Sequence, residues 1–167
     1  FEYDHERAAM PRAAAITRGA HVAAMRASAP GKNEYEIDAL YREVFRRNGS
    51  ERPAYTPIVG SGPNATVLHY HANNREMQAG ELLLVDAGCE YDYYAADVTR
   101  TWPVSGEFTE PQREIYQAVL DAQLAAIATV APGATIESIH EVTLRKLVEG
   151  MLALGLVQGE LDEVVKG

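Results

Sequence analysis

The chain has 167 residues, of which 47% are hydrophobic and 23% charged, as in a typical globular domain. Its formal net charge of −9 argues against nucleic acid or an anionic membrane as a partner, because both attract clustered Lys and Arg. The single cysteine, Cys89, excludes an internal disulfide and a cysteine-type zinc cluster, which favours a cytoplasmic location. No apolar run approaches the roughly 20 residues that span a bilayer.

Apolar residues at helical spacing predict two helices in the first third of the chain. The first covers residues 8–27, where Pro11 is tolerated only because it lies near the start. Asn33, with Glu36 three residues later, forms a capping-box pattern that begins a second, amphipathic helix ending near residue 48.

The chain then changes to strand-like runs and later returns to helices. Apolar or alternating runs bounded by turn residues predict four strands, at residues 54–59, 65–71, 81–88 and 93–102. Two more helices are predicted, at residues 109–130 and 136–155. Connections between the strands are too short for helical crossovers, which favours antiparallel pairing. The expected fold class is therefore α+β, with antiparallel strands covered by helices.

Two aspartates, Asp86 and Asp97, are the most informative residues of the chain. If their runs form a hairpin with its turn between Tyr91 and Asp92, Asp86 lies directly opposite Asp97, with Cβ atoms about 4.5–5.5 Å apart. Two facing carboxylates repel, and burying them in the charged form is costly, so cations are expected between them. Oxygen ligands favour Mn, Mg or Ca, and added imidazole admits Zn or Co. The turn contains no glycine, which disfavours a tight primed turn and leaves the register open.

Five histidines and the acidic residues of the second predicted helix are further candidate groups. His69 and His71 lie two apart in a strand-like run, which places both rings on one face. Beside a metal centre, one of the two would stabilise an oxyanion or protonate a leaving nitrogen. Surface or packing roles are expected for the remaining histidines: His5, His21 and His140. An ordinary solvated face is expected for three carboxylates: Glu34, Glu36 and Glu43.

Four motifs together resemble the Xaa-Pro aminopeptidases, also called aminopeptidase P. In chain order they are IVGSG at 58–62, VLHY at 67–70, LVDAGCEY at 84–91 and ADVTRTWPV at 96–104. The similarity extends from about Met10 to the end of the chain. It implies a pita-bread fold, of which residues 1–167 would form the N-terminal half of a single catalytic domain, truncated at both ends relative to the family.

The resemblance also implies a chemistry, the removal of an N-terminal residue that precedes proline. Two divalent metal ions, most commonly Mn with Co or Zn as alternatives, would be the cofactors. Asp86 would bind one ion with both oxygens, and Asp97 would bridge the two. His69 would be catalytic and contact the substrate near the scissile bond, and Tyr55 would bind substrate at the pocket.

The partners implied are a peptide with proline at its second position, the C-terminal half of the catalytic domain, and further copies of the protein as a homo-oligomer. The family completes its metal centre with a histidine and two glutamates farther along, and this chain does not contain them. Two carboxylates leave most coordination positions to water, so the isolated chain is expected to be inactive.

Three alternatives remain open at this stage. A prolidase, which cleaves only X-Pro dipeptides, has the same metal pattern. A methionine aminopeptidase fits less well with the sequence around Cys89 and Trp102. A metal-free pita-bread module that binds peptides or proteins would have no need of the facing carboxylates of Asp86 and Asp97.

Overall fold

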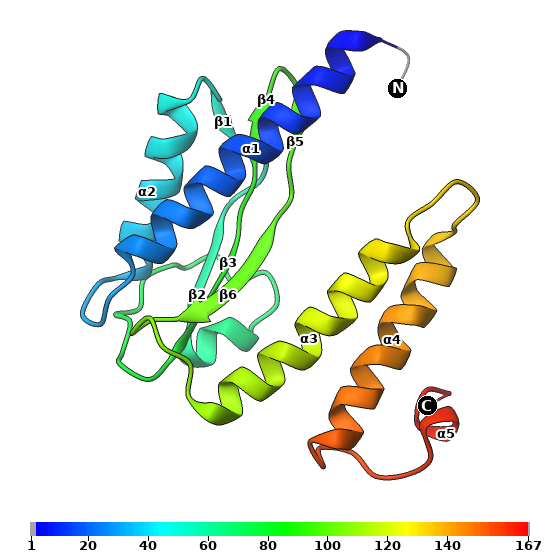
Figure 1. Ribbon diagram of the computed structural model, residues 1–167. Helices are drawn as coiled ribbons and strands as arrows, with labels where there is room; N and C mark the ends of the chain where they lie inside the picture. Colours follow the sequence, from blue (N-terminus) through cyan, green and yellow to red (C-terminus); the bar gives the residue numbers. More distant parts are fainter. Residues whose placement is uncertain (1–2, 167) are drawn as a thin grey trace. The chain divides into compact units, whose positions relative to one another are not determined.

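The structure, a computed structural model, describes residues 3–166 (Figure 1). The chain divides after Glu107 into two compact units. The first contains two long helices and two small antiparallel sheets, and the second is helical. This arrangement confirms the predicted α+β class with antiparallel strands.

The first unit begins with α1 (Asp4–Ala27) and α2 (Glu34–Arg47). Helix α1 starts before residue 8, so the expectation that Pro11 lies near a helix start is wrong. The interior proline is tolerated because it lies on the exposed face, where the carbonyl that loses its partner is open to water. At α2 the predicted capping is confirmed, since the Glu36 carboxylate accepts the Asn33 N–H at 2.7 Å.

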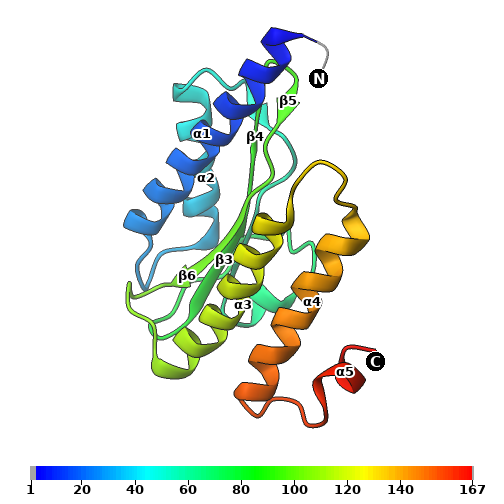
Figure 2. The same ribbon diagram turned by 45° about the vertical axis from the view of Figure 1, so that its right-hand side comes forward.

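The strands form two three-stranded antiparallel sheets. One has the order β1-β4-β5 and contains β1 (Arg52–Pro53), β4 (Cys89–Tyr91) and β5 (Tyr94–Ala95). The other has the order β2-β3-β6 and contains β2 (Ile58–Ser61), β3 (Leu82–Asp86) and β6 (Thr99–Pro103). Figures 1 and 2 agree that α1 and α2 lie on the same side of these strands.

The core lies between the helices and the strands. Successive side chains of a strand point to opposite faces, and on β3 the buried Leu83 and Val85 alternate with half-buried residues. Tyr41 and Phe45 of α2 belong to the same buried cluster. The half-buried face of β3 carries Asp86, and it is therefore the face away from this core.

Cys89 is buried where α1 meets the hairpin. Its Sγ lies 3.4 Å from the Ala13 carbonyl oxygen, and its N–H donates to Thr17 Oγ1 at 3.1 Å. Both partners belong to α1, so this residue holds the helix against the start of β4 through its backbone and its thiol.

The strand predicted at residues 65–71 is wrong. A 3-10 helix, η1 (Gly62–Thr66), is followed by irregular chain, in which His69 has a φ of 54° that no strand allows. The edge of β2 is paired instead by two side chains. Asn73 Oδ1 accepts the Val59 N–H at 3.0 Å and its Nδ2 donates to the Pro57 carbonyl at 2.9 Å, and Glu34 Oε1 accepts the Ser61 N–H at 2.7 Å. Polar side chains thus take the place of the missing strand. The apolar pattern of residues 65–71 does not reveal this replacement.

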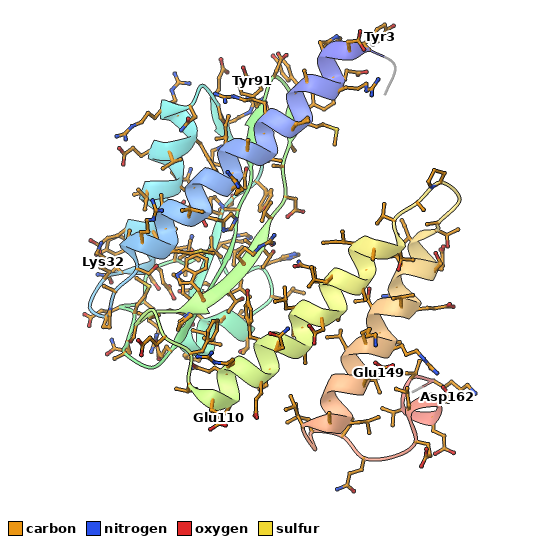
Figure 3. The ribbon with its side chains drawn as sticks, in the orientation of Figure 1. Tyr3, Lys32, Tyr91, Glu110, Glu149 and Asp162 are labelled. Carbon is orange, nitrogen blue, oxygen red and sulfur yellow. The ribbon has the colours of Figure 1, made fainter. Side chains whose placement is uncertain are left out.

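The second unit contains α3 (Glu110–Thr129), α4 (Ile136–Ala153) and the short α5 (Leu161–Val164). The two long helices confirm the predictions to within two residues at each end. They approach closely at Gly150, where an added Cβ would lie 2.7 Å from that of Ala118. Figure 3 shows Asp162 on α5, where its Oδ1 accepts from Arg145 of α4 at 2.7 Å. Helix α5 was not predicted.

Large apolar side chains of this second unit are exposed in the structure: Ile115, Val119, Leu124, Ile127, Val130, Ile136, Met151 and Leu156. Over the described residues, none of the helices has both the length and the apolar character required to cross a bilayer.

Candidate metal centre

The hairpin that carries the two aspartates has a register different from the predicted one. Asp86 pairs with Thr99, and the turn is formed by Asp92 and Tyr93, which have φ values of 52° and 67°. Positive φ at both central residues is the signature of a type I′ turn, which the absence of glycine had argued against. The prediction that Asp86 lies directly opposite Asp97 is therefore wrong by two residues. Since side chains alternate with period two, a shift of two leaves both aspartates on the same face.

The two carboxylates converge on one hydroxyl group. Tyr55 donates to Oδ1 of Asp86 in a short hydrogen bond, and its hydroxyl lies 2.9 Å from Oδ1 of Asp97. Burial raises the pKa of the Tyr55 phenol well above its ordinary value, and the hydrogen bonds to both carboxylates raise it further. The phenol thus stays protonated at neutral pH. It has only one proton to donate, so it satisfies one carboxylate at a time.

This carboxylate pair is chemically suited to a cation. Asp86 is half-buried and Asp97 exposed, and neither forms an ion pair with a Lys or Arg of the described residues. Two converging oxygens with one shared proton leave negative charge uncompensated, which a hard divalent ion would neutralise. Across residues 3–166, however, no group of three or more His, Cys, Asp or Glu side chains is arranged to hold a metal. The pair fits part of a metal site and would need ligands from elsewhere.

Gly88 allows the backbone beside Asp97 to come close. A Cβ at this position would lie 1.7 Å from the Ala96 carbonyl oxygen, and a change of side-chain rotamer could not relieve the clash because the Ala96 atoms are main chain. Residues 96–98 lie between β5 and β6 without a strand assignment of their own. They are held to the other arm by hydrogen bonds from Ala96 N–H to the Cys89 carbonyl at 2.9 Å and from Ala87 N–H to the Val98 carbonyl at 3.2 Å.

His21 of α1 reaches the same stretch from the helix side. Its Nε2 lies 3.0 Å from the Val98 carbonyl oxygen, and its Nδ1 lies 2.6 Å from the hydroxyl of Tyr41. Burial lowers the pKa of His21, which favours the neutral ring, although the carbonyl contacts oppose this effect. The expected packing role is confirmed, and the contact with the residue after Asp97 adds a detail that the sequence did not indicate.

His69 lies in the irregular segment after η1. Its side chain is exposed, and its ring stacks with that of His71, with centroids 6.4 Å apart and planes at 13°. The two rings lie side by side as predicted, although the strand proposed as the reason is absent. In the part of the chain that the structure describes, no hydrogen bond joins His69 to either aspartate. Its role in catalysis and substrate binding stays a prediction.

Glu34 is the residue that sequence reasoning misjudged most. It was expected on a solvated face, but it is fully buried and accepts hydrogen bonds from the N–H groups of Ser61 and Arg75 and from the hydroxyl of Tyr70, at 2.7, 3.0 and 2.7 Å. These donors lie at both ends and in the middle of the segment that carries His69. None of these donors belongs to α2, so no local pattern in the sequence indicated them.

Comparison with known proteins agrees with these features. The model of metallopeptidase family M24 matches residues 8–162. The Xaa-Pro aminopeptidase of Escherichia coli (strain K12) is 42% identical over 165 residues, which are 99% of this chain and 37% of that protein. The Xaa-Pro aminopeptidase of Haemophilus influenzae is 41% identical over 157 residues, 94% of this chain and 36% of that protein. The chain therefore spans a little over a third of the length of these relatives.

Solved structures give the same result. The aminopeptidase PepP of Pseudomonas aeruginosa matches with a TM-score of 0.97 at 41% identity, over 99% of this chain and 38% of that one. Aminopeptidase P from Escherichia coli with the inhibitor Pro-Leu matches with a TM-score of 0.97 at 42% identity and the same coverage. A zinc-substituted form of the latter, in complex with product, is equally similar. The fold is that of the first half of a pita-bread domain, and the chain belongs to metallopeptidase family M24.

Proposed function

We propose that this chain is the N-terminal half of the catalytic domain of an Xaa-Pro aminopeptidase. The whole enzyme would hydrolyse the bond between an N-terminal residue and a following proline, in the cytoplasm, with two divalent ions of which Mn is the expected kind. The observation that carries the proposal is the convergence of Asp86 and Asp97 on the Tyr55 hydroxyl without a neighbouring basic partner.

The described residues would supply one side of the metal site. Asp86 would bind one ion and Asp97 would bridge both, while the C-terminal half would contribute the remaining ligands. Bound divalent ions supply Lewis-acid polarisation of the scissile carbonyl and lower the pKa of water. Tyr55 would hold the two carboxylates at converging positions, since its protonated hydroxyl contacts both.

His69 would act on the substrate rather than on the metals. Its exposed ring can donate a hydrogen bond to a developing oxyanion or a proton to the departing proline nitrogen. Because the isolated chain has only part of the ligand set, it would bind metal weakly and leave peptides intact.

The test uses the full-length protein, with metal content measured by elemental analysis and activity on a tripeptide that has proline second. We expect two divalent ions per chain and release of the first residue. Asp97→Asn should lose metal and activity, whereas Asp92→Asn, an exposed aspartate in the turn of the same hairpin, should retain both.

Other results would assign another function. Cleavage of X-Pro dipeptides but not of the tripeptide would identify a prolidase. A wild-type protein that binds Xaa-Pro peptides without metal and without hydrolysis would identify a binding module. Full metal content in Asp97→Asn would contradict the proposed bridging role.

A further inference from the structure

Asp97 lies in residues 96–98, which have no strand assignment of their own. These residues separate β5 from β6, lie close to Gly88, and are tied to the opposite arm by hydrogen bonds at Ala96 and Val98. The side chain of Asp97 is exposed, so the place of its carboxylate depends on this backbone rather than on side-chain packing. A residue meant to bridge metal ions needs a tightly held backbone, because small displacements of a ligand weaken coordination.

The Val98 carbonyl, which directly follows Asp97, receives two hydrogen bonds. One comes from the Ala87 N–H across the hairpin at 3.2 Å, next to Asp86. The other comes from His21 Nε2 at 3.0 Å, from the buried side of the sheet. This carbonyl thus connects both aspartate-bearing arms of the hairpin to α1.

The tautomer of His21 follows from its two partners. The Val98 carbonyl can only accept, so Nε2 carries the hydrogen and donates. Nδ1 is then the acceptor and receives the Tyr41 hydroxyl hydrogen at 2.6 Å. The ring of Tyr41 is fully buried and meets the His21 ring edge-on, with centroids 5.1 Å apart, which fixes the orientation of the imidazole.

We infer that His21, oriented by Tyr41, is a positioning residue for the metal centre: its Nε2–H holds the Val98 carbonyl and thereby sets the place of the Asp97 carboxylate. The inference rests on the proposed function, in which Asp97 is a metal ligand. Groups that hydrogen-bond a metal ligand directly commonly change affinity by about 10- to 100-fold when they are lost. His21 acts through the main chain of the residue after Asp97, so we expect an effect at the lower end of that range.

The experiment compares two substitutions of His21 by amide side chains in the full-length protein. His21→Gln places an amide N–H near the position of Nε2 and can still donate to Val98. His21→Asn places its amide near Nδ1 and cannot reach that carbonyl. We measure Mn²⁺ affinity by titration calorimetry and thermal unfolding of the metal-free protein. His21→Asn should bind Mn²⁺ about 10-fold more weakly, and His21→Gln should recover most of the affinity.

Thr17→Val is the matched control, because Thr17 lies one turn earlier on α1 and also bonds the hairpin backbone, but at Cys89 and not beside Asp97. It should lower thermal stability and leave Mn²⁺ affinity unchanged. Tyr41→Phe keeps the aromatic ring of residue 41 but removes its hydrogen bond to Nδ1 of His21. This variant should also weaken Mn²⁺ binding, and it tests the inference even if a His21 variant fails to fold.

The outcomes separate this inference from the proposed function. If wild type binds Mn²⁺ and the two His21 amides bind it equally, whether tightly or weakly, the donated hydrogen bond does not position the site and the inference is overturned. Tyr41→Phe with wild-type affinity would also overturn it. If wild type binds no Mn²⁺, the proposed function fails and the inference fails with it.

Discussion

Replacing Glu34 by glutamine should destabilise the protein far more than the same change elsewhere on α2. Oε1 of Glu34 accepts from Ser61 N–H, Ser61 Oγ and Asn64 Nδ2, and Oε2 accepts from Tyr70 and from the Arg75 N–H. A glutamine NH₂ in the place of Oε2 can donate to the Tyr70 hydroxyl, but it leaves the Arg75 N–H without an acceptor.

The magnitude follows from this loss. One backbone N–H left unsatisfied costs about 1–3 kcal/mol, and the remaining bonds weaken when the acceptor is no longer charged, so we expect a total of about 2–4 kcal/mol. The control is Glu43→Gln, an exposed position on the same helix that forms a surface ion pair with Arg47 and should change stability by less than about 0.5 kcal/mol.

Urea unfolding of the purified proteins measures the difference in the free energy of unfolding between each variant and wild type. We expect a shift in the urea midpoint with no change in the dependence of that free energy on urea concentration. Burial would raise the pKa of Glu34, but the hydrogen bonds from Arg75, Ser61 and Tyr70 outweigh it and hold the pKa below its ordinary value of 4.5. The stabilising effect should therefore be complete above pH 4.5 and disappear as the pH falls through the folded-state pKa. Equal midpoints for Glu34→Gln and Glu43→Gln at pH 7 would refute the reasoning.

Three further predictions concern the hairpin, the histidine pair and the exposed helices. Gly88→Ala should displace the Ala96 carbonyl and cost several kcal/mol, measured by thermal unfolding; a wild-type melting temperature would show that the close approach is not required. His69→Ala in the full-length enzyme should keep its metals and lose mainly turnover, whereas His71→Ala should lower kcat less. A kcat of His69→Ala equal to that of wild type would remove His69 from the mechanism. The isolated chain should associate through its exposed apolar residues, and light scattering that reports a monomer would contradict this.

Much of the helical architecture was predictable because its signals are local. Capping residues and apolar spacing located α2, α3 and α4 to within two residues. The shared face of Asp86 and Asp97 was also predicted correctly, because the register differs from the predicted one by two residues and an even shift preserves the face.

The remaining features depend on contacts between residues distant in the sequence. The edge of β2 is paired by the side chains of Asn73 and Glu34, and no local pattern shows that these side chains take the place of a strand. The register of the hairpin depends on a turn in which Asp92 and Tyr93 adopt a conformation normally left to glycine. The burial of Glu34 required knowledge of the segment folded over it.

The position of Cys89 makes it a natural reporter of opening motions. It is the single cysteine of the sequence, and its sulfur is buried against the Ala13 carbonyl of α1. A thiol reagent can react with it only when α1 and the hairpin separate, so the labelling rate at neutral pH measures how often this contact opens. Labelling rates with and without added Mn²⁺ would therefore show directly whether ion binding on one side of the sheet slows the fluctuations of the helix on the other.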